Sequence, residues 1–164
     1  MRKKLVGLGV VTSLIGSGLV IGAMIPASSQ EGQTITVCDQ NREGYNKDIN
    51  VGKKGFSAGD YSLFRDKLWD TETGNRAGRL MGRLTFVKVL RKANDVFFIL
   101  DITTHLPGGE ITVYGDGKFG GFRNGLKFAI TGGTGSYNQA QGAVLAKFGR
   151  CDGKAGIRLT FNLA

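Results

Sequence analysis

Short apolar runs separated by glycine-rich polar segments make up the chain after residue 30. Eight of these runs are rich in Val, Ile, Thr, Phe and Tyr, which is typical of β-strands. They are Thr34–Cys38, Tyr61–Trp69, Arg79–Leu90, Val96–Leu106, Glu110–Gly115, Leu126–Thr131, Ala140–Phe148 and Ile157–Leu163. Turn-forming residues such as Pro107-Gly108-Gly109 and Asp152-Gly153 lie between them. The pattern predicts an all-β chain whose helices are confined to single turns.

The longest alternating run, Val96–Leu106, has two faces that both begin apolar and become polar toward its end. Phe98 and Leu100 lie on one face, and Phe97 and Ile99 lie on the other. A sheet with one face in water shows a cleaner split. The second face therefore contacts a partner subunit or lines a cavity, or a polar loop predicted over Asn41–Gly59 covers its end. No helical pattern alternates with the strands, which favours an antiparallel fold.

The N-terminal segment is predicted to be a signal peptide over residues 1–29. Arg2, Lys3 and Lys4 precede an uncharged apolar stretch from Leu5 to Ile25, and small residues follow it at Ala27 and Ser29. Cleavage after Ser29 releases a single mature domain of residues 30–164. An uncleaved membrane anchor is the alternative, because the apolar stretch is long enough to span a bilayer.

The charge of the mature chain does not indicate a nucleic-acid partner. Removing three basic residues with the signal peptide leaves 19 of the 22 Lys and Arg against 13 Asp and Glu, a net charge of +6. These basic residues are scattered along the chain, without a run longer than a pair. We therefore expect a secreted, extracellular protein that binds no nucleic acid and does not insert stably into a membrane once cleaved.

Two cysteines, Cys38 and Cys151, are predicted to form one disulfide, because an exported chain meets an oxidising compartment. No metal site is expected, since His105 is the only histidine. In a closed antiparallel barrel the first and last strands are neighbours. That closure brings the end of the first strand, at Cys38, close to Cys151 near the last strand.

The most distinctive motif is Gly132-Gly133-Thr134-Gly135-Ser136-Tyr137, followed by Gly142. It is not a phosphate-binding loop, because no Gly-Lys-Ser/Thr follows and no helix is opened. A second motif, Gly59-Asp60-Tyr61-Ser62-Leu63-Phe64-Arg65-Asp66-Lys67-Leu68-Trp69, lies upstream. A third, Ala77-Gly78-Arg79-Leu80-Met81-Gly82, follows the second.

In this order the three motifs resemble those of the allene oxide cyclase and dirigent superfamily, over about residues 59–163. The resemblance implies a single closed antiparallel β-barrel of about eight strands. It also implies a cofactor-free cyclase or isomerase that orients an apolar, polyketide- or lipid-derived molecule for cyclisation or stereocontrolled coupling. The alternative is a non-catalytic barrel that binds a hydrophobic ligand or a cell-envelope component. A homo-oligomer is compatible with either.

Three residues are candidates for catalysis. Asp66 stands where the cyclases have an Asn and the dirigent proteins an Asp. Near a barrel mouth, partial burial raises the pKa of its carboxyl and allows it to act as an acid, although a place in a surface turn is the alternative. Asp101 and His105 share one face of a strand and are expected as a pair on the cavity wall or as a surface salt bridge.

Three further residues are candidates for ligand binding. Tyr114 and Tyr137 line the predicted pocket or fill it. Gln141 stands where dirigent proteins often have an Arg near the glycine of the motif.

Overall fold

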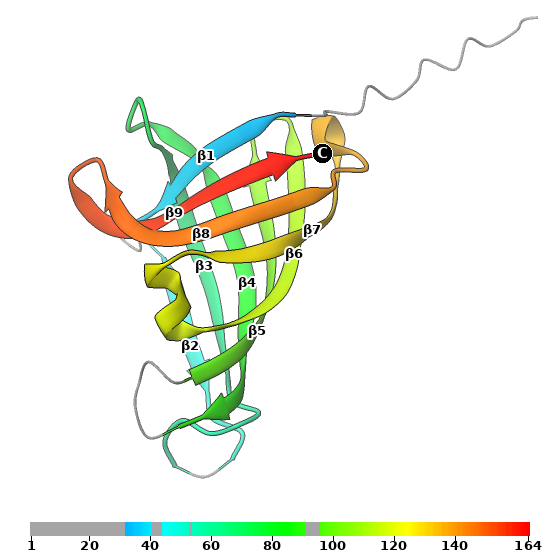
Figure 1. Ribbon diagram of the computed structural model, residues 1–164. Helices are drawn as coiled ribbons and strands as arrows, with labels where there is room; N and C mark the ends of the chain where they lie inside the picture. Colours follow the sequence, from blue (N-terminus) through cyan, green and yellow to red (C-terminus); the bar gives the residue numbers. More distant parts are fainter. Residues whose placement is uncertain (1–31, 41–43, 53, 91–95) are drawn as a thin grey trace, which may run out of the picture.

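The computed structural model describes residues 32–40, 44–52, 54–90 and 96–164. Within these ranges the chain forms nine β-strands and two short 3-10 helices (Figure 1). The strands are β1 (Thr34–Asp39), β2 (Tyr45–Ile49), β3 (Tyr61–Asp70), β4 (Arg76–Val89), β5 (Val96–Leu106), β6 (Gly109–Lys118), β7 (Leu126–Gly133), β8 (Gly142–Cys151) and β9 (Lys154–Leu163). The helices are η2 (Phe119–Arg123) and η3 (Gly135–Tyr137). The predicted signal peptide, residues 1–29, lies outside the described residues.

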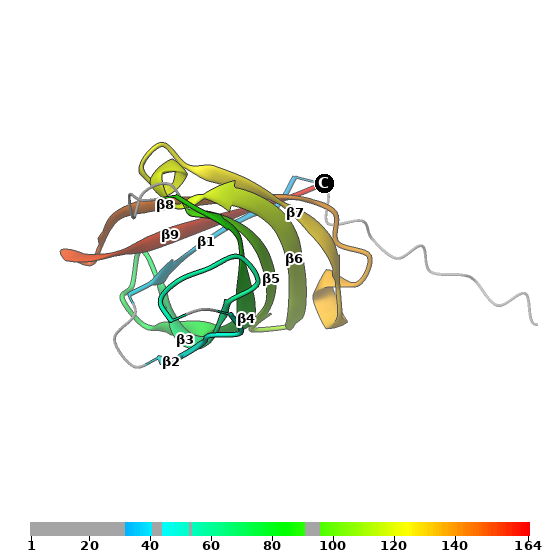
Figure 2. The same cartoon turned by 90° about the horizontal axis from the view of Figure 1, so that it is seen from below.

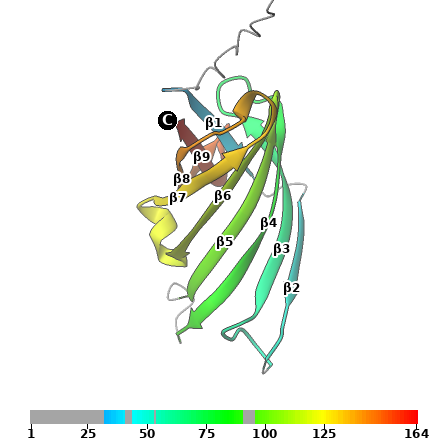
Figure 3. The same ribbon diagram turned by 90° about the vertical axis from the view of Figure 1, so that its right-hand side faces the viewer.

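The strands form one antiparallel sheet that closes into a barrel, as predicted. Consecutive strands pair from β2 to β9, and β1 closes the ring by pairing with both β9 and β3. Seen along the barrel, the strands curve around into a ring (Figure 2). Helix η2 and strand β2 lie on opposite sides of this barrel (Figures 2 and 3).

The additional strand, β2, falls in the segment that was predicted to be a loop, Asn41–Gly59. It pairs with Tyr61–Arg65 at the same edge of β3 whose far end pairs with β1. Four of its five side chains are exposed, so the alternation of apolar and polar positions that marks a half-buried strand is missing. Backbone hydrogen bonds to β3 make this segment a strand, and they leave no pattern in the sequence.

The two apolar faces of β5 have different surroundings. Phe98 and Leu100 are buried inside the barrel, whereas Phe97 and Ile99 are exposed on its outer wall. In the segment between β2 and β3, the Phe56 ring packs against the buried Phe86 and not against Phe97 or Ile99, with ring centroids 5.3 Å apart. Contact of the outer face with a partner subunit stays a prediction.

Aromatic side chains fill one end of the barrel. Phe98 is stacked on Phe122, with ring centroids 5.7 Å apart, and it also contacts the rings of Phe119 and Phe128. Helix η2 supplies two of these rings and so covers that end of the interior. Within the described ranges, no helix has the length and apolar character needed to cross a membrane.

The predicted disulfide between Cys38 and Cys151 is present, with the two Cα atoms 6.0 Å apart. It ties the end of β1 to Cys151, the last residue of β8. Beside it, the side-chain amide of Gln40 donates a hydrogen bond to the carbonyl oxygen of Cys151 at 3.1 Å. Gly156 lies so close that a Cβ there would overlap the carbonyl oxygen of Asp39. The disulfide thus fastens the strand that closes the barrel.

We predict that Cys38→Ser lowers the free energy of unfolding by about 4 to 5 kcal/mol on the chain-entropy model, because the bond links residues 113 positions apart. Urea unfolding of the oxidised protein and the variant measures the difference. The Cys38→Ser/Cys151→Ser double variant is the control and should match the single variant. Equal stability of the oxidised protein and both variants would contradict a stabilising role for the bond.

Candidate functional site

The barrel encloses a cavity of about 550 Å³. Aliphatic side chains and six phenylalanines dominate its lining, the phenylalanines being Phe64, Phe119, Phe122, Phe128, Phe148 and Phe161. The polar side chains that reach it are Asp39, Gln40, Asn46, Ser62, Asp66 and Thr104. Its size is typical of small-molecule sites in proteins, and so is the ratio of many apolar to few polar groups.

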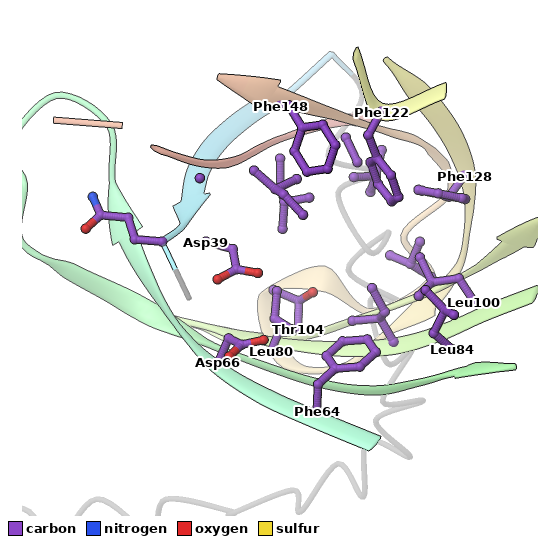
Figure 4. Close-up of a pocket in the computed structure, with 18 of the residues that line it drawn as sticks. Asp39, Phe64, Asp66, Leu80, Leu84, Leu100, Thr104, Phe122, Phe128 and Phe148 are labelled. Atoms are coloured by element: carbon purple, nitrogen blue, oxygen red, sulfur yellow. The ribbon is translucent and has the colours of Figure 1, made fainter. Parts of the chain in front are cut away.

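The alternation of β3 places Asp66 inside the barrel. Side chains at every second position, from Ser62 through Phe64 to Leu68, share its face. Leu68 is fully buried, and Asp66 is 7% exposed. Figure 4 shows the Asp66 carboxyl on the cavity wall, beside Leu80. The alternative that Asp66 lies in a surface turn is therefore wrong.

The carboxyl of Asp66 is buried, and one of its oxygens lacks a hydrogen bond within the described part of the chain. This oxygen is Oδ1. The backbone of Gly44 lies directly over it, and a Cβ at Gly44 would overlap Oδ1. Burial raises the pKa of Asp66 to about 6, and the negative charge of Asp39 adds to the increase. Near neutral pH this carboxyl can therefore take up or release a proton.

Asp39 is a site residue that the sequence analysis missed. It ends β1, next to Cys38, and its backbone lies between Leu68 of β3 and Ile157 of β9. Figure 4 shows the side chains of Asp39 and Asp66 turned toward one another at the side of the cavity away from the rings of Phe122 and Phe148. In the sequence, the only signal for Asp39 was its position next to Cys38. That position became informative when the structure placed this end of β1 opposite β3.

Thr104 is a second polar residue that the sequence analysis did not select. It is 1% exposed and lines the cavity. In the sheet register Asp66 is paired with Leu80, and Leu80 is paired with Thr104. Two strand spacings separate Thr104 from Asp66, or about 10 Å. The hydroxyl of Thr104 is therefore a polar group farther along the same wall.

Asp101 and His105 lie on the outer wall, so their predicted place on the cavity wall is wrong. They alternate with Leu100 and Thr104, which face the interior. The imidazole Nδ1 of His105 lies 2.8 Å from Oε1 of Glu110, not beside Asp101. The alternative, a surface salt bridge between Asp101 and His105, is wrong as well, because His105 contacts Glu110 instead.

The three predicted ligand-binding residues do not reach the cavity either. Tyr114 is 51% exposed on the outer wall, and Gln141 is exposed beside the C-terminal residues. Tyr137 is buried, but its hydroxyl donates a hydrogen bond to the carbonyl oxygen of Pro107 at 3.0 Å. The backbone N–H of Ser136 likewise donates to the carbonyl of Gly108. The glycine-rich motif thus packs against the β5–β6 turn, outside the cavity.

No group of three or more His, Cys, Asp or Glu side chains in the described part of the chain is placed to hold a metal ion. Among the described residues, the carboxylates that reach the cavity are those of Asp39 and Asp66. The other polar groups that these residues contribute there are the amides of Gln40 and Asn46 and the hydroxyls of Ser62 and Thr104.

No family model matches the chain. No curated protein sequence is significantly similar to it. Solved structures do resemble it. A pyocyanin demethylase superposes with a TM-score of 0.65 at 24% identity, covering 80% of this chain and all of the other.

Two further similar structures are of proteins that are described with other activities. The Diels–Alderase AbmU from Streptomyces koyangensis superposes with a TM-score of 0.56 at 13% identity. The match covers 84% of this chain and 72% of the AbmU chain. The pterocarpan synthase dirigent protein GePTS1 has a TM-score of 0.57 at 15% identity, covering 80% of each chain. The protein therefore has the allene oxide cyclase and dirigent-like barrel fold that the motifs predicted. Identities this low establish the fold alone.

We predict that Asp66→Asn stabilises the protein by about 1 to 3 kcal/mol at about pH 7.5 and not at all below about pH 4. The folded-state pKa is raised above the ordinary value of 3.8, so the folded protein holds this proton more tightly than the unfolded chain. The free energy of unfolding of the wild type therefore falls as the pH rises from about 4 to about 6, and an amide escapes this loss.

Urea unfolding at the two pH values measures the effect. The control is Asp101→Asn, which changes an exposed carboxylate on the outer wall and should alter stability little at either pH. A wild type as stable as Asp66→Asn at about pH 7.5 would show that the buried carboxylate is compensated.

Proposed function

We propose that the protein is a cofactor-free cyclase or isomerase that orients an apolar small molecule, derived from a polyketide or a lipid, inside the barrel. The observation that carries the proposal is the apolar cavity of about 550 Å³ with the buried carboxyl of Asp66 on its wall, whose Oδ1 accepts no hydrogen bond from a described residue. Structures of the same fold include proteins described as a Diels–Alderase and a pterocarpan synthase dirigent protein. Those activities support this choice of reaction class.

The cavity supplies orientation first. A flexible apolar substrate loses conformational freedom when the rings of Phe64, Phe122, Phe128 and Phe148 enclose it. Holding it in a near-attack conformation removes much of the entropic part of the barrier to ring closure. This contribution comes from the shape of the cavity, which favours one conformer of the substrate.

Asp66 supplies the proton chemistry in this proposal. Because the pKa of its carboxyl is about 6, both the protonated and the ionised forms are populated near neutral pH. Asp66 takes up or releases the proton that the rearrangement moves at the polar end of the substrate. Asp101, His105, Tyr114, Tyr137 and Gln141, placed outside the cavity, have no part in it.

The energetics of Asp66 favour an enzyme over a simple hydrophobic carrier. Burying a carboxyl without its full set of hydrogen bonds destabilises the folded state. Apolar side chains alone suffice to bind a hydrophobic ligand. A group that lowers stability in the middle of a binding cavity is typical of sites where chemistry takes place.

We predict that Ala146→Phe abolishes both ligand binding and turnover, because Ala146 lines the cavity and is 2% exposed. Binding is measured by the fluorescence of the neutral probe N-phenylnaphthylamine. The matched control is Ala129→Phe, which places the same ring on the exposed face of the adjacent strand β7 and should leave binding unchanged. Melting curves identify any variant that fails to fold.

Turnover is measured by incubating the protein with a metabolite extract of the producing organism. Cyclisation and isomerisation leave the molecular mass unchanged, so the expected product has a new retention time and the same mass as a consumed compound. Asp66→Asn should bind the probe but form this product slowly, by a factor of about a hundred or more. Equal product formation by the wild type and Ala146→Phe would contradict the proposal.

We also propose that the protein is exported, with residues 1–29 as a cleaved signal peptide and residues 30–164 as the secreted domain. The disulfide between Cys38 and Cys151 supports an oxidising compartment. We predict that N-terminal sequencing of protein recovered from the culture medium begins at Gln30. Full-length protein in the membrane fraction would support an anchor instead.

A further inference from the structure

Four exposed apolar side chains lie together at one end of the barrel. The loop between β2 and β3 and the C-terminal end of β4 lie at this end, at the bottom of Figures 1 and 3. Val51 and Phe56 of the loop are 65% and 63% exposed, and Val87 and Leu90 at the end of β4 are exposed as well. We call these four side chains the apolar tip.

A buried carboxylate holds the loop that carries Val51 and Phe56. Asp60 is buried, and its two oxygens accept hydrogen bonds from the backbone N–H groups of Val51 at 2.8 Å and Ser57 at 2.7 Å. The backbone N–H of Phe86 in β4 donates to the carbonyl oxygen of Asp60 at 2.8 Å, and the ring of Phe56 packs on that of Phe86. The loop is thus fixed against β4, so a partner that binds the tip has little ordering of the loop to offset.

The opposite end of the barrel has no such side chains. The strands are connected there by residues 71–75, 107–108 and 134–141, at the top of Figure 1. All of these residues are described, and none of them is an exposed Val, Leu, Ile, Met, Phe, Tyr or Trp. Exposed apolar side chains are therefore not a general property of the connections in this protein, and a cluster of them at one end indicates an interaction site.

Basic side chains accompany the apolar tip. Among the described residues at positions 50–60 and 84–90, the exposed charged side chains are Lys54 and Lys88, and the remaining charge, Asp60, is buried. Lys53 and residues 91–95 lie outside the described ranges and contribute three basic residues and one acidic residue by composition. The net charge of these two segments is positive wherever those residues lie.

This combination suits a lipid surface better than a protein partner. Each side of a standard protein interface contributes about 20 to 30 residues that fit the partner in shape, and the tip consists of four side chains on a loop and a strand end. A bilayer demands no complementary shape. Apolar side chains enter the boundary between headgroups and acyl chains, and lysines are attracted to anionic headgroups.

We propose that the apolar tip docks the protein reversibly on a bilayer that contains anionic lipids. Val51 and Phe56 enter the interface, and Lys54 and Lys88 contact lipid phosphates. The docking is peripheral and involves no spanning segment. The inference does not rest on the proposed function.

Docking in this way turns the aromatic end of the cavity toward the bilayer. The ring of Phe56 contacts that of Phe86, and the ring of Phe86 lies 6.4 Å from that of Phe119, between centroids. Phe119 lines the cavity. An apolar molecule dissolved in the bilayer is then close to the part of the barrel that is built to hold one.

The test measures cosedimentation of the chain from Gln30 with lipid vesicles. This chain contains every described strand, and it omits the apolar stretch Leu5–Ile25, which would bind vesicles by itself. We expect binding to phosphatidylcholine vesicles that contain about 30% phosphatidylglycerol, and at least about ten-fold weaker binding to phosphatidylcholine alone or in about 0.5 M salt.

The apolar part of the tip is tested by Val51→Ser/Phe56→Ser, which should weaken binding at least about ten-fold. The matched control is Met81→Ser/Tyr114→Ser. It removes two exposed apolar side chains from the outer wall and should bind vesicles as the wild type does. Melting curves confirm that each variant is folded.

The basic part is tested by Lys54→Gln/Lys88→Gln, which should also weaken binding about ten-fold or more, since each lysine near an anionic surface contributes about five-fold. Its control is Arg76→Gln/Arg79→Gln. This variant removes the same charge from exposed positions at the other end of β4 and should retain most of the affinity.

The orientation is tested by fluorescence. Trp69, the single tryptophan of the chain, lies near the end of β3 that is far from the loop. Its emission should not shift when anionic vesicles are added to the wild type. In Phe56→Trp the introduced indole should shift to shorter wavelength with vesicles and be quenched by brominated lipids, because it enters the interface.

Several outcomes would overturn the inference. The first is a wild type that does not bind anionic vesicles, and the second is a loss of binding in Met81→Ser/Tyr114→Ser as large as that in the tip variant. A third is a wild-type dimer in size-exclusion chromatography that Val51→Ser/Phe56→Ser dissociates, because the tip is then an interface between two copies. In each case binding of N-phenylnaphthylamine in the cavity, which these variants leave intact, reports on the proposed function separately.

Discussion

The pairing of β1 with both β9 and β3 is the constraint on which the rest of the structure depends. It closes the sheet, and a closed sheet encloses the cavity. The disulfide at Cys38 holds this strand at the end where it pairs with β3. The next residue is Asp39, so the same closure sets a carboxyl opposite Asp66. The position of β1 therefore both closes the barrel and brings the Asp39 carboxyl to the site.

Some side chains around the cavity stabilise the folded state, and Asp66 destabilises it. Buried phenylalanines and aliphatic side chains stabilise the barrel, although they leave a cavity between them. Asp66 acts in the other direction, because its charge is disfavoured by burial and by Asp39. The bond between Cys38 and Cys151 offsets part of this loss by restricting the unfolded chain. A small barrel can retain a cavity with a buried carboxyl on its wall when its seam is covalently fixed.

The motifs that resemble allene oxide cyclases and dirigent proteins act in this chain in two different ways. The segment around Asp66 contributes directly to the cavity wall. The glycine-rich segment at Gly132–Tyr137 does not, because its backbone and the Tyr137 hydroxyl bind the turn between β5 and β6. Its glycines allow this approach, since a Cβ at Gly135 would overlap the carbonyl of Gly108. The motif therefore indicates the fold, and Asp66 indicates the chemistry.

The sequence by itself determined eight of the nine strands in the described ranges, because alternating apolar positions and turn residues are local signals. The closed barrel followed from the motifs that resemble a known superfamily, and the disulfide followed from two cysteines in a chain predicted to be exported. The sequence also selected Asp66, through a motif. Tertiary structure decided which face of each strand points inward. Alternation separates His105 from Thr104 but does not say which of them lies inside, and the packing of the neighbouring strands placed Thr104 there. It also revealed β2, which only backbone pairing defines, and Asp39, whose role arises from a residue brought beside it from another strand.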